Sequence, residues 1–189
     1  FGVKSSLTGG PPGGTGAGGL DGLFHNGLYT VTVDGEPVSL QLGGGGEVDV
    51  YPDASNPTVS AGTWDAGGIS RLYHNVNNPL TINTGTFANF GTGVVVSGLS
   101  LFISREGSDV VDKFSLSSDL LGLGLSGGNY ADFLEHTFAA NTMVSGSEYY
   151  VSIEFFNLTD AYQVAGLDGA LAIGLFTSRT EFTISVVPE

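Results

Sequence analysis

The 189-residue chain contains no cysteine, which excludes disulfide bonds, thiolate metal ligands and thiol nucleophiles. Basic residues are also scarce: the chain has five lysine and arginine residues and nineteen aspartate and glutamate residues, which gives a formal net charge of −14. Such a charge argues against nucleic acid and anionic membrane surfaces as partners and favours cations. No apolar run approaches the roughly 18 residues that a membrane-spanning helix needs.

Apolar residues and glycine are abundant instead. Hydrophobic residues make up 41% of the chain, and 31 residues are glycine. That hydrophobic content can form one sizeable core, which distinguishes the chain from a disordered acidic segment. The length fits a single domain, for which about 150–200 residues is usual.

Glycine and proline are concentrated near the start of the chain. Residues 9–19 read GGPPGGTGAGG, the composition of a linker. They separate residues 1–8, in which Phe1, Val3 and Leu7 share one face of an extended strand. A lone strand cannot satisfy its own backbone hydrogen bonds, so we expect it to pair with another sheet. The predicted organisation is an N-terminal extension strand (1–8), a Gly/Pro-rich linker (9–19) and one β-sandwich domain (20–189).

Apolar and polar residues alternate almost everywhere after the linker, which is the pattern of half-buried β-strands. Asp34-Gly35, between two such segments, predicts a tight hairpin turn. Residues 148–156 carry apolar side chains on both faces of a strand, which predicts a central strand. Residues 171–177 and 181–187 alternate on either side of Ser178-Arg179, which we interpret as a second hairpin.

Helical patterns are scarce. Residues 129–136 (NYADFLEH) are predicted to form two helical turns with Asn129 as the N-cap. Many short strands separated by glycine, asparagine and aspartate turns indicate two packed sheets. The predicted fold class is therefore all-β: an antiparallel β-sandwich of jelly-roll type with one short helix and a detached N-terminal strand.

Catalytic motifs are weak. Residues 124–128 match GxSxG around Ser126, but such a match is expected by chance in a glycine- and serine-rich chain, and the α/β sheet that the motif requires is absent from the pattern. The histidines His25, His74 and His136 stand singly, without the spacing of a zinc site. We therefore predict no catalytic or cofactor-binding residues and a protein that is not an enzyme.

Clustered carboxylates are the chemistry that stands out. Glu47 and Asp49 project from one face of a predicted strand, Asp53 follows that strand, and Asp109 and Asp112 lie in a predicted loop from residue 107 to 112. Calcium takes six to eight oxygens, which acidic glycine-rich loops can supply. These five residues are the predicted calcium ligands. The alternative interpretation is that the acidic residues keep a sheet surface soluble and prevent its edge strands from pairing with other chains.

The chain ends Val187-Pro188-Glu189, directly after a predicted strand. This ending resembles the sorting junction of PEP-CTERM proteins, which Gram-negative bacteria export, which exosortase sorts and which are often linked to the biofilm matrix. The acidic, glycine-rich, cysteine-free body is similar to that family as well. The resemblance implies a secreted chain, processed or truncated at the Val-Pro-Glu junction and located outside the cell or on its surface. It assigns no catalytic residue, because the family has mostly no known ones.

These features predict a structural subunit of an extracellular bacterial fibre or biofilm matrix, in which a terminal strand of one subunit completes the sheet of the next. Head-to-tail contacts of this kind do not close, so they propagate as filaments. The expected partners are further copies of the chain, as a homopolymer, and exopolysaccharide. The alternative is a monomeric carbohydrate-binding or adhesive β-sandwich, with Tyr51, Trp64 and Tyr73 either stacking on sugars or packing in the core.

Two terminal strands are candidates for donation. Residues 181–187 alternate as residues 1–8 do, but they lie close in sequence to a hairpin partner, and closing a short loop costs little entropy. We therefore favour Phe1, Val3 and Leu7 as the assembly residues, with the choice between the two termini left open.

Overall fold

The computed structural model describes residues 27–33, 36–42, 51–67, 70–87, 94–117, 131–163 and 171–188. Within these ranges the chain is all-β and contains no helix. The strands are β1 (Gly27–Val33), β2 (Glu36–Leu42), β3 (Thr58–Val59), β4 (Thr63–Trp64), β5 (Arg71–Asn75), β6 (Leu80–Asn83), β7 (Val96–Arg105), β8 (Ser108–Leu116), β9 (Glu135–Phe138), β10 (Glu148–Gln163) and β11 (Leu171–Val187).

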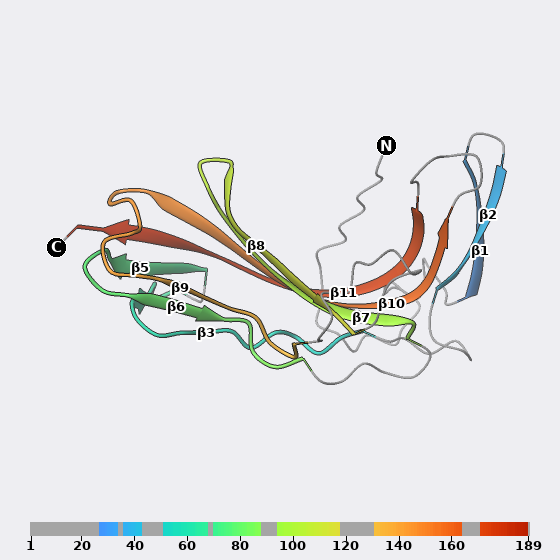
Figure 1. Cartoon of the computed structure of the whole chain (residues 1–189), viewed down its shortest axis with the longest axis horizontal. Helices are drawn as coiled ribbons and strands as arrows, with labels where there is room; N and C mark the ends of the chain where they lie inside the picture. The colour runs from blue at the N-terminus through green and yellow to red at the C-terminus, as the bar shows by residue number, and fades with distance from the viewer. Residues whose placement is uncertain are drawn as a thin grey trace.

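Two sheets form the body of the molecule (Figure 1). The larger sheet has the strand order β4-β5-β11-β10-β7-β8, and the smaller one has the order β3-β6-β9. All described pairs are antiparallel except β5 and β11, which run parallel. Two facing sheets with an apolar interior are consistent with a β-sandwich. The all-β class predicted from the period-two pattern is confirmed.

The core lies between the six-stranded and the three-stranded sheet. Val151, Ile153 and Phe155 of β10 alternate with polar residues and are fully buried, and Leu80 and Ile82 of β6 meet them from the smaller sheet. Each such side chain contributes about 1.5–3 kcal/mol by leaving water. The inner face of the larger sheet is therefore the face toward β3, β6 and β9. We call the opposite face the outer face.

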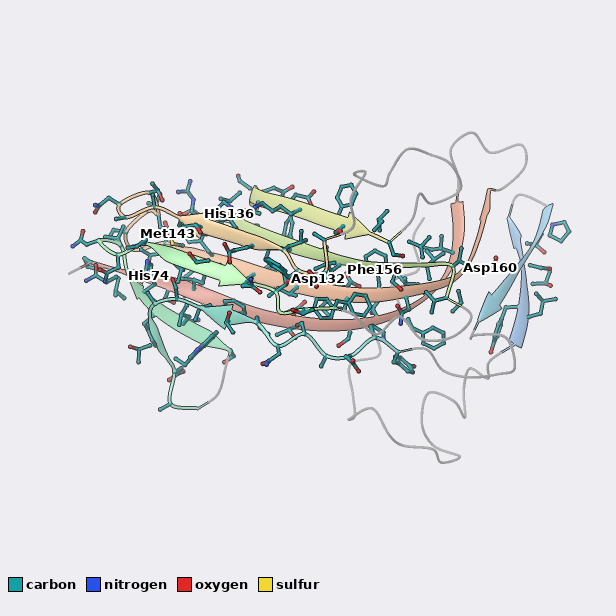
Figure 2. The ribbon with its side chains drawn as sticks, turned by 60° about the horizontal axis from the view of Figure 1, so that its bottom comes forward. His74, Asp132, His136, Met143, Phe156 and Asp160 are labelled. Carbon is teal, nitrogen blue, oxygen red and sulfur yellow. The ribbon has the colours of Figure 1, made fainter. Side chains whose placement is uncertain are left out.

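A long ribbon of β10 and β11 runs the length of the molecule (Figure 1). Their register is continuous from Glu148 opposite Ser185 to Leu158 opposite Leu175, and a bulge follows before Asp160. Bulges bend and twist a strand. Beyond this bulge, near the labelled Asp160 in Figure 2, the ribbon curves toward the β1–β2 hairpin, with β2 beside both strands.

The central strand predicted at residues 148–156 is confirmed, because β10 lies between β11 and β7. The hairpin predicted around Ser178-Arg179 is wrong. These two residues continue β11 and pair with Phe155 and Glu154 of β10. Neither is a glycine, asparagine or proline, so nothing local forces a turn there. The long partner strand keeps the chain extended.

The helix predicted at residues 129–136 is wrong over its described part. Residues 131–134 are not helical, and β9 starts at Glu135 and pairs with β6. The Leu134 carbonyl accepts from the Thr84 amide at 3.0 Å, and the Asp132 carbonyl accepts from the Phe87 amide at 2.7 Å. Two isolated helical turns are only marginally stable in water, so the backbone forms hydrogen bonds with a neighbouring strand instead of a helix.

Two hairpins follow from local turn chemistry. β1 and β2 pair with Val33 opposite Glu36, which leaves Asp34-Gly35 as the two-residue connection and confirms that prediction. β7 and β8 join through Glu106 and Gly107, which have φ of 51° and 77° as a type I′ turn requires. The loop predicted from residue 107 to 112 is therefore wrong, because β8 begins immediately after this turn.

Several sequence predictions fall outside the described residues. They are the extension strand with Phe1, Val3 and Leu7, the linker at 9–19, the acids Glu47 and Asp49, and the residues His25 and Ser126.

Substitution of Gly98 is expected to be costly. Gly98 lies on β7 opposite Phe156 of β10, and an added Cβ would approach Phe156 Cε2 to 2.7 Å and Leu116 Cδ2 to 2.8 Å. Such overpacking costs about 1–3 kcal/mol, so we expect Gly98→Ala to lower the free energy of unfolding by that amount. Urea denaturation measures it.

Gly67→Ala is the matched control, because an added Cβ there meets no atom within 4 Å. We expect it to change stability by less than about 0.5 kcal/mol. The double variant Gly98→Ala/Phe156→Leu, in which leucine replaces the larger ring, should recover part of the unfolding free energy lost in Gly98→Ala. Equal stability of Gly98→Ala and wild type would contradict the packing of Phe156 across Gly98.

Candidate interaction surfaces of the six-stranded sheet

The predicted calcium ligands do not gather within the described part of the chain. Asp53 precedes β3, between Tyr51, whose ring contacts Phe176 of β11, and Ser55, which donates a hydrogen bond to Thr180 of β11. Asp109 and Asp112 lie on β8, and β10 and β7 separate β8 from β11 in the sheet. Among the described residues, no group of three or more histidines, aspartates or glutamates can hold a metal ion.

A β-bulge places Asp109 and Asp112 on the same face of β8. Asp109 pairs with Ser104 and Asp112 with Phe102, so Val110 is the extra residue of the bulge. In a regular strand, residues three apart point to opposite faces. The consecutive valines 110 and 111 break the alternation and are the sequence signal for this bulge. Both carboxylates therefore lie on the outer face, at the edge of the sheet.

An arginine-centred cluster occupies the middle of the outer face. Arg179 Nε donates to Ser152 Oγ at 2.9 Å and lies 2.6 Å from Glu181 Oε1, and Nη2 donates to the Tyr150 hydroxyl at 2.9 Å. Burial and a hydrogen bond with Glu181 raise the pKa of Tyr150, although Arg179 opposes them. Exposed pairs of this kind contribute about 0–1 kcal/mol, so the cluster mainly orders side chains on the sheet.

A second cluster joins β5 to the ribbon. Arg71 Nη1 donates to Ser185 Oγ at 2.9 Å and forms an ion pair with Glu148, and Ser185 Oγ donates to Glu148 Oε1 at 3.2 Å. One side chain from each of β5, β11 and β10 therefore meets here. These contacts support the parallel attachment of β5 to one end of β11.

The three aromatic residues for which both sugar stacking and core packing were considered do not share one surface. Trp64 packs edge-on against Phe182 at 5.2 Å on the inner side, and Tyr51 packs edge-on against Phe176 at 4.8 Å. Tyr73 is exposed and pairs with Ser185 on the outer side. Trp64 therefore packs against the core, whereas Tyr51 and Tyr73 are 44% and 41% exposed.

The outer face carries other exposed aromatic surface. Phe114 of β8 is 58% exposed and pairs with Ser100 of the adjacent strand β7. Phe102 and Phe156 are half-buried on the same face. Aromatic surface beside the Arg179 cluster is the kind of surface that can stack on a ligand ring.

Two histidines are positioned by the core. His74 is 1% exposed, and its Nε2 lies 3.2 Å from the Asn78 carbonyl, to which it donates in the corresponding tautomer. His136 lies on β9, its ring edge-on to Phe138. Figure 2 shows both in the half of the molecule away from β1 and β2. Burial lowers the pKa of both, and Lys113 lowers that of His136 further.

We expect stability to fall as the pH drops below 6.5. The folded pKa of His74 lies below the ordinary value of 6.5, so in this window the unfolded chain binds more protons than the folded one. Unfolding free energies at about pH 7.5 and about pH 5.5 measure the effect. His74→Asn, which cannot protonate, should show a smaller difference between the two pH values. An unchanged difference would contradict the assignment to His74.

Two long sheet edges have no strand partner among the described residues. β8 pairs with β7 alone. β11 pairs with β10 along almost its whole length, but β5 covers its other edge only from Thr183 to Val187. Residues 171–182 of β11 therefore present one free edge within the described fold. Free edges are templates for pairing with another strand.

No family model matches the chain, and no curated protein matches it in sequence. The resemblance to PEP-CTERM proteins therefore stays a prediction. Among the described residues, no helix is long and apolar enough to cross a membrane.

Proposed function

We propose that this chain is a structural subunit of an extracellular bacterial fibre or biofilm matrix. In this proposal, a terminal donor strand of one subunit adds to a sheet edge of the next. The supporting observation is that residues 171–182 of β11 have one edge without a strand partner in the described part of the chain. An added strand pairs with the unsatisfied backbone groups of such an edge.

The N-terminal residues are the better donor. Residues 183–185 of β11 pair with β5 on one side and β10 on the other, so the C-terminal strand is engaged within its own sheet. Residues 1–8 alternate through Phe1, Val3 and Leu7 and are joined to the body by a glycine-rich spacer. A donor and an acceptor at different places on one subunit make a heterologous contact, which propagates as a filament.

Electron microscopy and light scattering of the purified chain test this proposal. We expect filaments whose length grows with protein concentration. A protein that stays monomeric at all concentrations would contradict it. The same preparation, applied to a panel of acidic and neutral polysaccharides, tests whether exopolysaccharide is a further partner of the filament.

A monomeric carbohydrate-binding or adhesive sandwich is the second candidate. The observation that favours it is the exposed Phe114 on the outer face, the face that also carries the Arg179 cluster. A monomer that binds a polysaccharide, and loses that binding in Phe114→Ala, would support this candidate over the first. The jelly-roll connection also remains a proposal, supported by two facing sheets but complicated by the parallel β5–β11 pair.

Calcium stays a prediction, motivated by the net charge of −14 and by the acids near residue 50 and on β8. A ligand that binds only the folded state adds about 2.7 kcal/mol at 100 times its dissociation constant. For a domain of this size that raises the melting temperature by roughly 5–10 °C. Thermal unfolding with calcium and with a chelator measures it. Identical melting curves, with no metal in elemental analysis, would contradict the prediction.

A further inference from the structure

We propose that the acceptor site is the β11 edge at residues 171–182, occupied in line with β5 by residues 1–8 of a second copy. This inference rests on the proposed function, since it names the surface at which the subunits meet.

The length of the free edge fits the donor. β5 occupies five of the seventeen residues of β11, which leaves twelve without a partner on that side in the described fold. A strand rises about 3.3 Å per residue, so the free edge spans roughly 40 Å and an eight-residue donor needs roughly 26 Å. The donor can therefore lie end to end with β5 along the same edge.

Exposed apolar side chains lie beside this edge. Ile173 and Leu175 of β11 are 44% and 37% exposed and point to the same face of the strand. A neighbouring strand places its alternate residues next to such side chains, and cross-strand apolar pairs are favourable. Phe1, Val3 and Leu7 alternate in the same way and can cover them.

The competing edge, β8, is blunted. The bulge at Val110 interrupts its regular pairing, and the carboxylates of Asp109 and Asp112 flank the bulge. Bulges and charged side chains are the devices by which edge strands avoid pairing with other chains. The free part of β11 has no described bulge of its own, since the register shift before Asp160 adds its extra residue to β10. Its two charged residues, Arg179 and Glu181, pair with each other.

Cysteine cross-linking tests the assignment, because the natural chain has no cysteine to interfere. In full-length filaments, Val3→Cys combined with Leu175→Cys, or with Thr177→Cys, should form intersubunit disulfides under mild oxidation and give a ladder on a non-reducing gel. Two positions are used because disulfides form only when the Cα atoms lie about 4.4–6.8 Å apart. Lys4→Cys with Leu175→Cys is the matched control, since residue 4 points to the other face of the donor.

Val3→Cys combined with Phe114→Cys reports on the β8 edge. A ladder from this pair, and none from the β11 pairs, would overturn the inference while leaving the fibre proposal intact. Filaments that cross-link through neither edge would also overturn it. Absence of filaments from the wild-type chain would instead contradict the proposed function itself.

Hydrogen exchange provides a readout without substitutions in β11. Amides of residues 171–182 should exchange roughly tenfold slower or more in wild-type filaments than in a monomeric chain lacking residues 1–8. Residues 108–116 should change little. The reverse pattern would place the acceptor on β8 and overturn the inference.

Discussion

Deletion of residues 1–8 is expected to convert the assembled protein into soluble monomers that no longer polymerise. Three apolar side chains, Phe1, Val3 and Leu7, would leave their site on the neighbouring subunit. At about 1.5–3 kcal/mol each they supply roughly 5–9 kcal/mol before the cost of ordering the strand. Backbone hydrogen bonds add about 0.5–1.5 kcal/mol each. Electron microscopy and sedimentation measure the loss of filaments.

Point substitutions separate the donor strand from a general effect of truncation. Val3→Asp with Leu7→Asp should abolish polymerisation, because both charges enter the apolar side of the strand. Ser6→Asp with Thr8→Asp adds the same charge to the other side and should have a smaller effect. A peptide of residues 1–8, added in excess, should cap growing ends. Filaments of normal length from the deleted chain would rule out this donor.

Replacement of Phe155 by alanine is expected to lower the free energy of unfolding by about 3–5 kcal/mol. Phe155 is 1% exposed at the centre of β10, and its ring stacks on Phe87 with centroids 4.8 Å apart. Domains of ordinary stability have about 5–15 kcal/mol in total, so this loss is a large fraction. Urea denaturation of the chain lacking residues 1–8 measures it without interference from assembly.

Phe114→Ala is the matched control for this substitution. This substitution also removes a phenylalanine ring, but from β8, where the ring is 58% exposed. We expect it to change the free energy of unfolding by less than about 0.5 kcal/mol. Similar losses from the two variants would mean that the core does not lie between the two sheets as described.

Local chemistry explains which sequence predictions succeeded. The Asp34-Gly35 hairpin was predictable because two residues specify the turn and the strands on either side are adjacent in sequence. The central position of β10 was predictable because apolar residues on both faces mark a strand with neighbours on both sides. The turn at Glu106-Gly107 was missed because glutamate is uncommon at a positive φ, although the following glycine marks the position.

The candidate interaction surfaces were less predictable. Asp109 and Asp112 share a face only because of the bulge at Val110, which depends on how β8 pairs with β7. The continuation of β11 through Ser178-Arg179 depends on the full length of its partner β10. Residues 131–134 are not helical and β9 is a strand because Thr84, Phe87 and β6 bond to their backbone. In each case a contact distant in sequence overrides a local preference.

The sequence by itself determined that this protein is all-β, that it has one sizeable core and that β1 and β2 form a hairpin. These properties depend on the alternation of side chains and on turn residues, which act over a few positions along the chain. Only the tertiary structure decided that β5 pairs in parallel with the far end of β11 and stops there, which leaves residues 171–182 with one free edge among the described strands. The two strands are about a hundred residues apart, and their pairing depends on the packing of both sheets around the core. No pattern within either strand encodes it.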